Sequence, residues 1–338
     1  MSGGVDSSVA AALLKEEGHD VIGLTMRLMP HSAAIEDARK VANILGIPHH
    51  VIDFRDIFAR TIIDDFCREY ALGRTPNPCV RCNEYIKFGA LREKAAEMGA
   101  DFIATGHYAR VEKDGTEILL KKGIDTKKDQ SYFLCRLTCE QLSHTMFPIG
   151  HLTKIKVRQI ARENGLPTAS RPESQEICFI PDNDYAGFLK GYLKQPPQPG
   201  PIMDGRGNVL GEHRGITAYT IGQRHGLGIA AAEPLYITAI APDRNAVVVG
   251  TKAQTYGTEM VAGNLNWIAL KSPDYPVNVK ARIRYRHPEA AATVTPLDDG
   301  NYYVKFAAPQ MAITPGQTIA FYDGDTIIGG GTIIRQGR

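Results

Sequence analysis

Apolar residues in the first hundred positions occur alternately at helical spacing and in short continuous runs. The spacing predicts helices and the runs predict buried strands, in the order helix 9–14, strand 21–26, helix 35–45, strand 50–53, helix 57–70, helix 83–98 and strand 102–105. Helices that alternate with buried strands are typical of a parallel sheet covered by helices on both faces. We therefore expect an α/β fold with a doubly wound parallel sheet and a ligand site at the carboxyl ends of its strands.

The pattern changes after Gly106. A hairpin with its turn at residues 113–115 comes next, and apolar spacing then predicts helices at 156–164 and 185–193. A proline-rich run at 195–201 has the composition of a linker. Beyond it, short β-branched segments are separated by turn residues. We expect three domains: an ATP-binding and catalytic domain at 1–197, a small β-rich domain at 198–256 and a β-barrel-like, tRNA-binding domain at 257–338.

The composition bears on whether the protein spans a membrane, is secreted or binds nucleic acid. The 338 residues are 43% hydrophobic and 22% charged, and no apolar run approaches the roughly 20 residues that span a bilayer. The first motif is not preceded by a signal peptide, which would consist of a charged region followed by an apolar region. We therefore expect a cytoplasmic protein with no membrane partner. The net charge of +2 is too small to indicate a nucleic-acid partner by itself. In residues 280–287, however, cations alternate with apolar residues, and a strand there would carry a basic stripe suited to phosphates.

The six cysteines do not resemble a disulfide framework in a chain this long without a secretion signal. Cys67, Cys135 and Cys139 lie in helix-like apolar patterns, where a free cysteine is usually a small core residue. Cys79 and Cys82 are clustered, which favours metal binding or thiol chemistry.

The opening residues predict a phosphate-binding loop. They read Ser2-Gly3-Gly4-Val5-Asp6-Ser7-Ser8 and run directly into the first helix. Glycines let backbone N–H groups approach a phosphate, hydroxyls add donors, and the helix N-terminus adds a positive dipole. The Gly-Lys-Ser/Thr ending of a Walker motif is absent. A bare Ser-Gly-Gly would indicate only a turn and a helix cap.

This heptad resembles the PP-loop of the ATP pyrophosphatase superfamily, whose members adenylate an oxygen and release pyrophosphate. Five further strings, in order along the chain, resemble the tRNA-specific 2-thiouridylase family. They are TPNPCVRCN at 75–83, TGHY at 105–108, KDQSYFL at 128–134, SQEICFI at 174–180 and TIGQRHG at 220–226. The resemblance therefore covers nearly the whole chain.

The resemblance implies a tRNA-uridine 2-sulfurtransferase that uses ATP and Mg²⁺. Adenylation turns the C2 oxygen of the wobble uridine into a leaving group, and AMP and pyrophosphate are released. Sulfur arrives on a persulfide of Cys178, and Cys82 then releases it by forming a disulfide. Cys82 lies just ahead of a helix, where the dipole favours its thiolate. The implied partners are tRNA and a sulfur donor, either a cysteine desulfurase or a sulfur relay carrier.

Other roles carry over position by position from the family. Residues matching the nucleotide site are Ser2, Gly3, Gly4, Val5, Asp6, Ser7, Met26 and Gly106. Residues matching the target-base site are Asn77, Pro78 and Cys79. Residues matching tRNA contacts are His107, Lys128, Asp129, Gln130, Arg284, Tyr285 and Gln317.

Two departures from the family pattern bear on function. A PP-loop normally follows the central strand of its sheet, whereas Met1 directly precedes it here. We expect the sheet to lack that strand, and about eight further upstream residues to raise thermal stability. In addition, Cys79 stands where persulfide-type relatives usually carry Asp. Cys79, Cys82 and Cys178 could then hold three irons of an iron–sulfur cluster, or Cys79 could assist Cys82 without metal.

Three other functions stay open on the residues alone. A different PP-loop enzyme, such as an amide- or argininosuccinate-forming synthetase, would need the heptad but not the pair of Cys82 and Cys178. A non-catalytic RNA-binding protein would need the basic strand but not the phosphate loop. A truncated and inactive relic would fit the missing strand.

Overall fold

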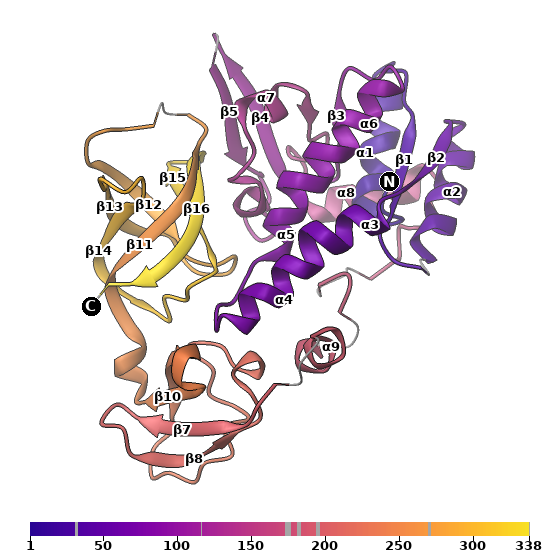
Figure 1. Ribbon diagram of the computed structural model, residues 1–338. Coiled ribbons are helices and arrows are strands. Elements are labelled where there is room, and N and C mark those ends of the chain that lie inside the picture. The colour runs from indigo at the N-terminus through magenta and orange to yellow at the C-terminus, as the bar shows by residue number, and fades with distance from the viewer. Residues whose placement is uncertain are drawn as a thin grey trace.

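The computed structural model divides the chain into three parts (Figure 1). It describes residues 1–30, 33–115, 117–172, 177–180, 184–193, 197–269 and 272–337. Residues 174–176 of the SQEICFI string and residues 195–196 of the proline-rich run lie outside the described residues. No helix among those described is long and apolar enough to cross a membrane.

The N-terminal part contains the helices and parallel strands that the sequence predicts. Its strands are β1 (Gly23–Arg27), β2 (His49–Asp53), β3 (Ile103–Ala104), β4 (Ala109–Asp114), β5 (Glu117–Lys122) and β6 (Thr145–Met146). Its α-helices are α1 (Val5–Glu16), α2 (Ala33–Leu45), α3 (Arg55–Phe58), α4 (Asp64–Ala71), α5 (Pro78–Arg81), α6 (Leu91–Glu97), α7 (Cys139–Ser143), α8 (Lys154–Glu163) and α9 (Tyr185–Tyr192). The remaining helical turns are η1 (Ala59–Ile63), η2 (Cys82–Ala90) and η3 (Ser131–Leu134).

The parallel sheet is present as two separate pairs of strands. β1 pairs with β2 in parallel, and β3 pairs with β6 in parallel. Among the described residues, no ladder joins the two pairs. Helices α1, α2 and α8 pack together beside them through Val9, Val41 and Val157, which are fully buried. The predicted α/β class and parallel pairing are therefore confirmed.

Two predicted helices are interrupted by π-helical turns. A single helix was expected over residues 57–70, and the structure has α3, the π-helix η1 and α4 in succession. The helix expected from Asn83 begins earlier, at Pro78, where the Asn77 side chain caps it by accepting from the Val80 N–H at 3.3 Å. Its central part is the nine-residue π-helix η2. Apolar spacing did not reveal these turns, because both helix types bury one face.

The C-terminal part is a closed barrel of six strands. They are β11 (Tyr256–Trp267), β12 (Val277–Arg282), β13 (Ala290–Pro296), β14 (Tyr302–Met311), β15 (Thr318–Asp323) and β16 (Thr326–Gln336). The order is β11-β14-β13-β12-β15-β16, and the pairing of β11 with β16 closes the sheet. Met260, Val304 and Phe321 are fully buried in its core. The predicted barrel is confirmed, and closure leaves it no free edges.

The middle part is a four-stranded sheet in the order β8-β7-β10-β9. The strands are β7 (Gly200–Asp204), β8 (Val209–His213), β9 (Tyr236–Ala241) and β10 (Ala246–Gly250). Three 3₁₀ turns accompany them, η5 (Ile216–Ala218), η6 (Pro242–Arg244) and η7 (Lys252–Thr255). Ile202, Ile237 and Val247 form its small buried core.

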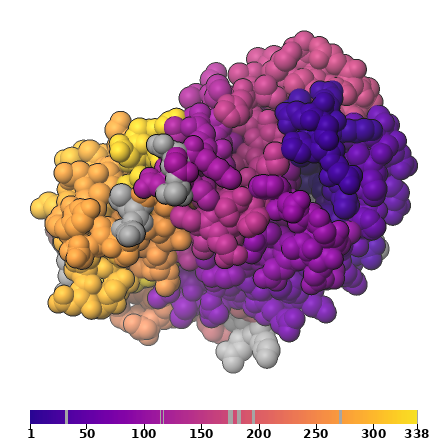
Figure 2. Space-filling view, turned by 90° about the horizontal axis from the view of Figure 1, so that it is seen from above, coloured from indigo at the N-terminus to yellow at the C-terminus, as the bar shows by residue number. Residues whose placement is uncertain are grey.

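The barrel is joined to the N-terminal part by a shared sheet. The β4–β5 hairpin adds to β16, with Leu120 opposite Ile327. Seen from above, the two parts form one continuous surface (Figure 2). The barrel is therefore fixed against the N-terminal part by backbone hydrogen bonds as well as by side chains.

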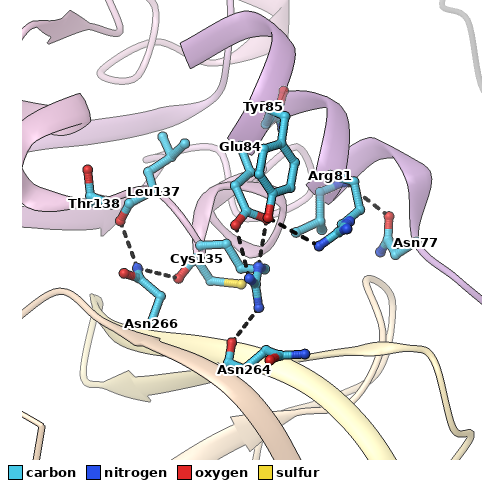
Figure 3. Close-up of polar contacts among 12 residues, drawn as sticks. Asn77, Arg81, Glu84, Tyr85, Cys135, Leu137, Thr138, Asn264 and Asn266 are labelled. Carbon is cyan, nitrogen blue, oxygen red and sulfur yellow. Dashed lines mark hydrogen bonds and ion pairs between the residues drawn. The ribbon is translucent and has the colours of Figure 1, made fainter. Parts of the chain in front are cut away.

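A largely buried ion pair adds to this interface (Figure 3). Arg136 bonds both carboxylate oxygens of Glu84, at 2.7 and 2.9 Å, and donates to the backbone carbonyl of Asn264 in β11. The Asn266 side chain donates to the Leu137 carbonyl at 2.8 Å. Glu84 belongs to η2, so this pair also fixes the π-helix relative to the barrel.

We expect Arg136→Met to lower the free energy of unfolding by about 3 kcal/mol, because Glu84 would keep a largely buried charge without its partner. The matched control is Arg92→Met, which removes an ion pair with the exposed Glu140 and should cost less than about 1 kcal/mol. Urea titration followed by circular dichroism measures both. Equal losses in the two variants would contradict the role given to Arg136.

Candidate functional site

The loop at residues 2–7 is pre-formed by its own hydroxyls. The Ser2 N–H donates to the Ser7 Oγ at 3.1 Å, and the two hydroxyls lie 3.0 Å apart. Gly3 has φ +70°, and a Cβ there would lie 2.5 Å from the Ala34 carbonyl oxygen. Only glycine fits this position without strain. The loop therefore presents its backbone N–H groups at the start of α1, as an anion site requires.

A buried lysine lies beside the loop. Lys154 Nζ is 2.8 Å from both carboxylate oxygens of Asp6, and the Tyr108 hydroxyl donates to Asp6 at 2.8 Å. Sequence reasoning missed Lys154, but one signal was available. It is the first residue of α8, where the helix dipole disfavours a cation, so a carboxylate partner was to be expected.

The two other predicted nucleotide residues are Gly106, which packs against this loop, and Met26, which lies near the carboxyl end of β1. A Cβ on Gly106 would lie 2.5 Å from the carbonyl carbon of Asp6 and 2.6 Å from the Ser7 nitrogen, so the absence of a side chain allows the two segments to touch. Met26 lies near the carboxyl end of β1 and is half-buried. The carboxyl edge of a parallel sheet is where such folds bind ligands.

Cys82 and the Cys178 segment share one hydrophobic cluster. Phe179 and Ile180, which follow Cys178, pack with Cys82 in that cluster. The Phe179 ring lies 5.4 Å from that of Phe66 in α4. Cys82 is 8% exposed, whereas Cys178 and Cys79 are exposed to water. All six cysteines are free thiols in this structure.

The three thiols lie close enough for electrostatic interactions among them to change their pKa values. Burial raises the pKa of Cys82 to about 12, and the charges of Cys178 and Cys79 add to that rise. Burial also raises the pKa of Cys79 and of Cys178. Water reaches these two side chains, which moderates the effect. The Lys87 ammonium lowers the pKa of all three thiols and opposes the rise.

The predicted target-base residues lie where all three parts of the chain meet. The Thr75 N–H donates to the Pro315 carbonyl at 2.9 Å, and the Gln317 amide donates to the Thr75 carbonyl at 2.9 Å. Asn77 caps α5, and Pro78 is buried as the first residue of that helix. The loop that carries Asn77 is therefore held by the barrel.

His107 is predicted to contact tRNA and lies half-buried beside Phe88 of η2. Its ring lies 5.9 Å from those of Phe88 and Phe147, and Nδ1 lies 2.6 Å from the Thr105 hydroxyl. Burial lowers its pKa well below the usual value, and the charge of Lys87 lowers it further. His107 is therefore neutral at physiological pH.

Several predicted tRNA contacts use their side chains inside the protein. Asp129 is buried, accepts from the Gly123 and Ser131 N–H groups, and lies 3.6 Å from Arg282. Gln130 accepts from the Tyr108 N–H at 3.1 Å. Lys128, which precedes them, is half-buried.

The basic stripe at 280–287 differs from its prediction. Strand β12 ends at Arg282, so Arg284 and Tyr285 lie beyond it. Arg282 forms an ion pair with Glu289 at 2.8 Å, which occupies its charge. Arg284 donates to the Met311 carbonyl at 3.2 Å, and the Tyr285 ring lies 4.4 Å from that of Phe133. Ile283 is still buried in the barrel core, and the chain then turns at residues 285–286.

A cluster of metal ligands is not found at the thiols. Cys79, Cys82 and Cys178 are all described, and among the described residues no three His, Cys, Asp or Glu side chains form a group that could hold a metal ion. The described residues therefore give no support to the iron–sulfur alternative.

Three family models match consecutive parts of the chain. They are described as a tRNA methyl transferase HUP domain at residues 1–182, a tRNA methyl transferase PRC-barrel domain at 186–251 and an aminomethyltransferase beta-barrel domain at 257–333. These ranges follow the three parts of the fold.

Curated relatives match over nearly their whole length. The "tRNA-specific 2-thiouridylase MnmA 1" of Caldanaerobacter subterraneus subsp. tengcongensis is 51% identical, over 100% of this chain and 97% of the relative. The proteins named "tRNA-specific 2-thiouridylase MnmA" of Heliobacterium modesticaldum and Moorella thermoacetica are also 51% identical. They cover 99% and 98% of this chain and 91% and 98% of their own lengths.

The thiols should react with iodoacetamide in an order set by exposure. We expect Cys178 and Cys79 to be alkylated well before Cys82 and the fully buried Cys135. Because their pKa values are raised, their rates should keep rising above pH 9, the ordinary value for cysteine. Peptide mass spectrometry measures each site, with the urea-unfolded chain as the control. A rate plateau below pH 9, or Cys82 reacting as fast as Cys178, would contradict this picture.

Proposed function

The chain belongs to the tRNA-specific 2-thiouridylase family, and from this premise we propose that it replaces the C2 oxygen of the wobble uridine of tRNA with sulfur. It is a tRNA-modifying transferase that uses ATP. The observation that carries the proposal is one domain holding both an anion-binding loop and three thiols within the electrostatic reach of one another. We place its action in the cytoplasm, where its tRNA substrate is found.

The first step is adenylation of the uridine C2 oxygen. The backbone N–H groups of residues 2–7 bind the phosphates of ATP, and the helix dipole of α1 stabilises their charge. Hydrogen bonds from Lys154 and Tyr108 orient the Asp6 carboxylate. The C2 oxygen attacks the α-phosphorus, the bond to pyrophosphate breaks, and the oxygen becomes part of a good leaving group.

Mg²⁺ would accompany ATP at this loop. Asp6 is the carboxylate that would hold it, since it is the acidic residue of the loop and lies at the N-terminus of α1. When bound, the ion neutralises the charge of the pyrophosphate group.

The second step is sulfur transfer. The terminal sulfur of a Cys178 persulfide attacks C2, and AMP leaves with the electron pair of the carbon–oxygen bond. Cys82, having lost its proton, attacks the Cys178 sulfur, and the sulfur–sulfur bond breaks. Its electron pair stays with the sulfur on the uridine as the thiocarbonyl, and a Cys82–Cys178 disulfide remains. A dithiol reductant must restore both thiols, and a sulfur-donor protein must reload Cys178.

The tRNA is placed by residues around these thiols. Asn77, Pro78 and Cys79 contact the target base, at the start of helix α5 and directly after a loop that the barrel holds in place. Contacts to the rest of the tRNA come from His107, Lys128, Gln130, Arg284, Tyr285 and Gln317, and the buried Asp129 supports them by holding the backbone of its own segment. Because Nδ1 of the neutral His107 is bonded to the Thr105 hydroxyl, its Nε2 is left to make one hydrogen bond, as donor or acceptor, with a base or a sugar.

The thiols discriminate between this function and its alternatives. An amide- or argininosuccinate-forming synthetase has no use for Cys82 and Cys178 within electrostatic reach of each other. Methyl transfer, which the names of two matching models suggest, needs neither a phosphate loop nor paired thiols. A non-catalytic RNA-binding protein would not need the loop at residues 2–7.

Cys178→Ser and Cys82→Ser should each lower 2-thiouridine formation more than 100-fold. Both should still form AMP and pyrophosphate from ATP in the presence of tRNA, because adenylation does not use the thiols. Cys139→Ser is the matched control and should keep full activity, since a hydroxyl also donates to the Ile268 carbonyl. Nucleoside mass spectrometry and chromatography of nucleotides measure the products. Formation of ADP and phosphate instead would contradict the adenylation step.

The same assay separates the persulfide relay from an iron–sulfur enzyme. Wild-type protein purified without oxygen should be colourless, and Cys79→Asp should stay active within about tenfold, because Cys79 is not part of the relay. A brown protein whose activity is lost in Cys79→Asp would overturn the relay.

A further inference from the structure

The π-helix η2 sets the position of a lysine relative to Cys82. In a π-helix the N–H of each residue bonds the carbonyl five residues earlier, so Lys87 lies one turn beyond Cys82 and near the same side. In an α-helix, with 3.6 residues per turn, five residues would rotate Lys87 about 140° away from Cys82. The π-helical turn therefore brings the ammonium and the thiol to one side.

The charge of Lys87 reaches groups from three separate segments. They are Cys79 and Cys82 in the continuous helix of α5 and η2, Cys178 in the segment 177–180 and His107 after β3. These residues are up to 99 positions apart in sequence, since Cys79 and Cys178 lie at the two ends of that range. The same ammonium therefore lowers the pKa of the three thiols and of His107, the histidine predicted to contact tRNA.

The Lys87 ammonium has no carboxylate partner in the part of the chain that the structure describes. Among the described residues, none forms a hydrogen bond or ion pair with it, although the side chain is half-buried. The neighbouring acid on the same helix, Glu84, is occupied by Arg136. Asp65, on α4, is occupied by Arg68 and Arg81. An ordinary solvated lysine on a helix face would lie away from a buried thiol such as Cys82.

We propose that Lys87 is a positioning residue for sulfur transfer, holding the anionic sulfurs of Cys178 and Cys82 beside the activated base. The inference rests on the proposed function for the identity of the reaction. In that reaction the terminal persulfide sulfur of Cys178 is anionic before it attacks C2, and Cys82 must be a thiolate before it breaks the sulfur–sulfur bond. A nearby unpaired cation stabilises both anions relative to their protonated forms. Both thiols otherwise lie in surroundings that disfavour a charge.

Lys87→Met and Lys87→Arg, made in the full chain, test this role. The first readout is the pH profile of Cys178 alkylation, which needs neither ATP nor tRNA. Lys87→Met should move the profile to higher pH by about one unit, so that alkylation at fixed pH slows roughly tenfold. Lys87→Arg should leave the profile near that of the wild type, because the charge is kept. Lys94→Met, which removes an exposed lysine of α6 paired with Glu97, is the matched control and should change nothing.

The second readout is a single turnover with ATP, tRNA and persulfide-loaded protein. Lys87→Met should form 2-thiouridine about 10- to 100-fold more slowly while AMP forms at the wild-type rate, and Lys87→Arg should recover most of the loss. An unchanged alkylation profile in Lys87→Met would overturn the proposal, as would an equal loss of AMP formation. If the wild type makes no 2-thiouridine, the proposed function is wrong. The alkylation profile still shows, independently of that result, whether the charge of Lys87 stabilises the Cys178 thiolate. Matching thermal melting curves exclude misfolding as the cause.

Discussion

The loop at residues 73–77 is the constraint on which the site depends. The barrel holds it through the Pro315 carbonyl and the Gln317 amide, at 2.9 Å each. Gly316, with φ +89°, packs so closely that a Cβ there would lie 2.9 Å from the Thr75 nitrogen. The middle part contacts the same loop, because a Cβ on Gly73 would meet the side chains of Ile240 and Pro242 at 2.8 Å. Helix α5 begins directly after this loop. It contains Cys79, and Cys82 is the residue that follows it.

This arrangement explains why a barrel without thiols matters for sulfur chemistry. This loop carries the residues that we propose to bind the target base, and a displacement of about 1 Å can reduce a reaction rate by about 100-fold. Contacts from two other domains oppose such a displacement. The ion pair of Glu84 with Arg136 adds a second fixed point, further along the helix that carries Cys82.

Charges in this protein are arranged differently at the largely buried ion pairs and at the thiols. The largely buried Arg136 has a carboxylate partner in Glu84, and Lys154 has one in Asp6. Such pairs avoid the large desolvation penalty of a lone charge. Near the thiols the Lys87 cation has no carboxylate partner among the described residues. Anionic sulfur or tRNA phosphate can therefore interact with it without first breaking an ion pair.

The sequence by itself determined the local features of this protein. Apolar spacing predicted the parallel α/β part and the barrel, since the periodicity of a helix or a strand is written in consecutive residues. The glycines and serines of residues 2–7 predicted the phosphate loop, because its geometry depends on contacts among near neighbours. The motif strings also led to the family, which the comparisons confirm.

Only the tertiary structure decided which side chains are available for chemistry. The contact between Lys154 and Asp6 joins residues 148 positions apart, and that of Gln317 with Thr75 joins residues 242 apart. No local pattern records such contacts. Asp129 was predicted as a tRNA contact, yet in the fold its carboxylate binds backbone N–H groups. The π-helical turn that brings Lys87 toward Cys82 was equally hidden, because α- and π-helices both bury one apolar face and differ only in which hydrogen bonds the folded backbone makes.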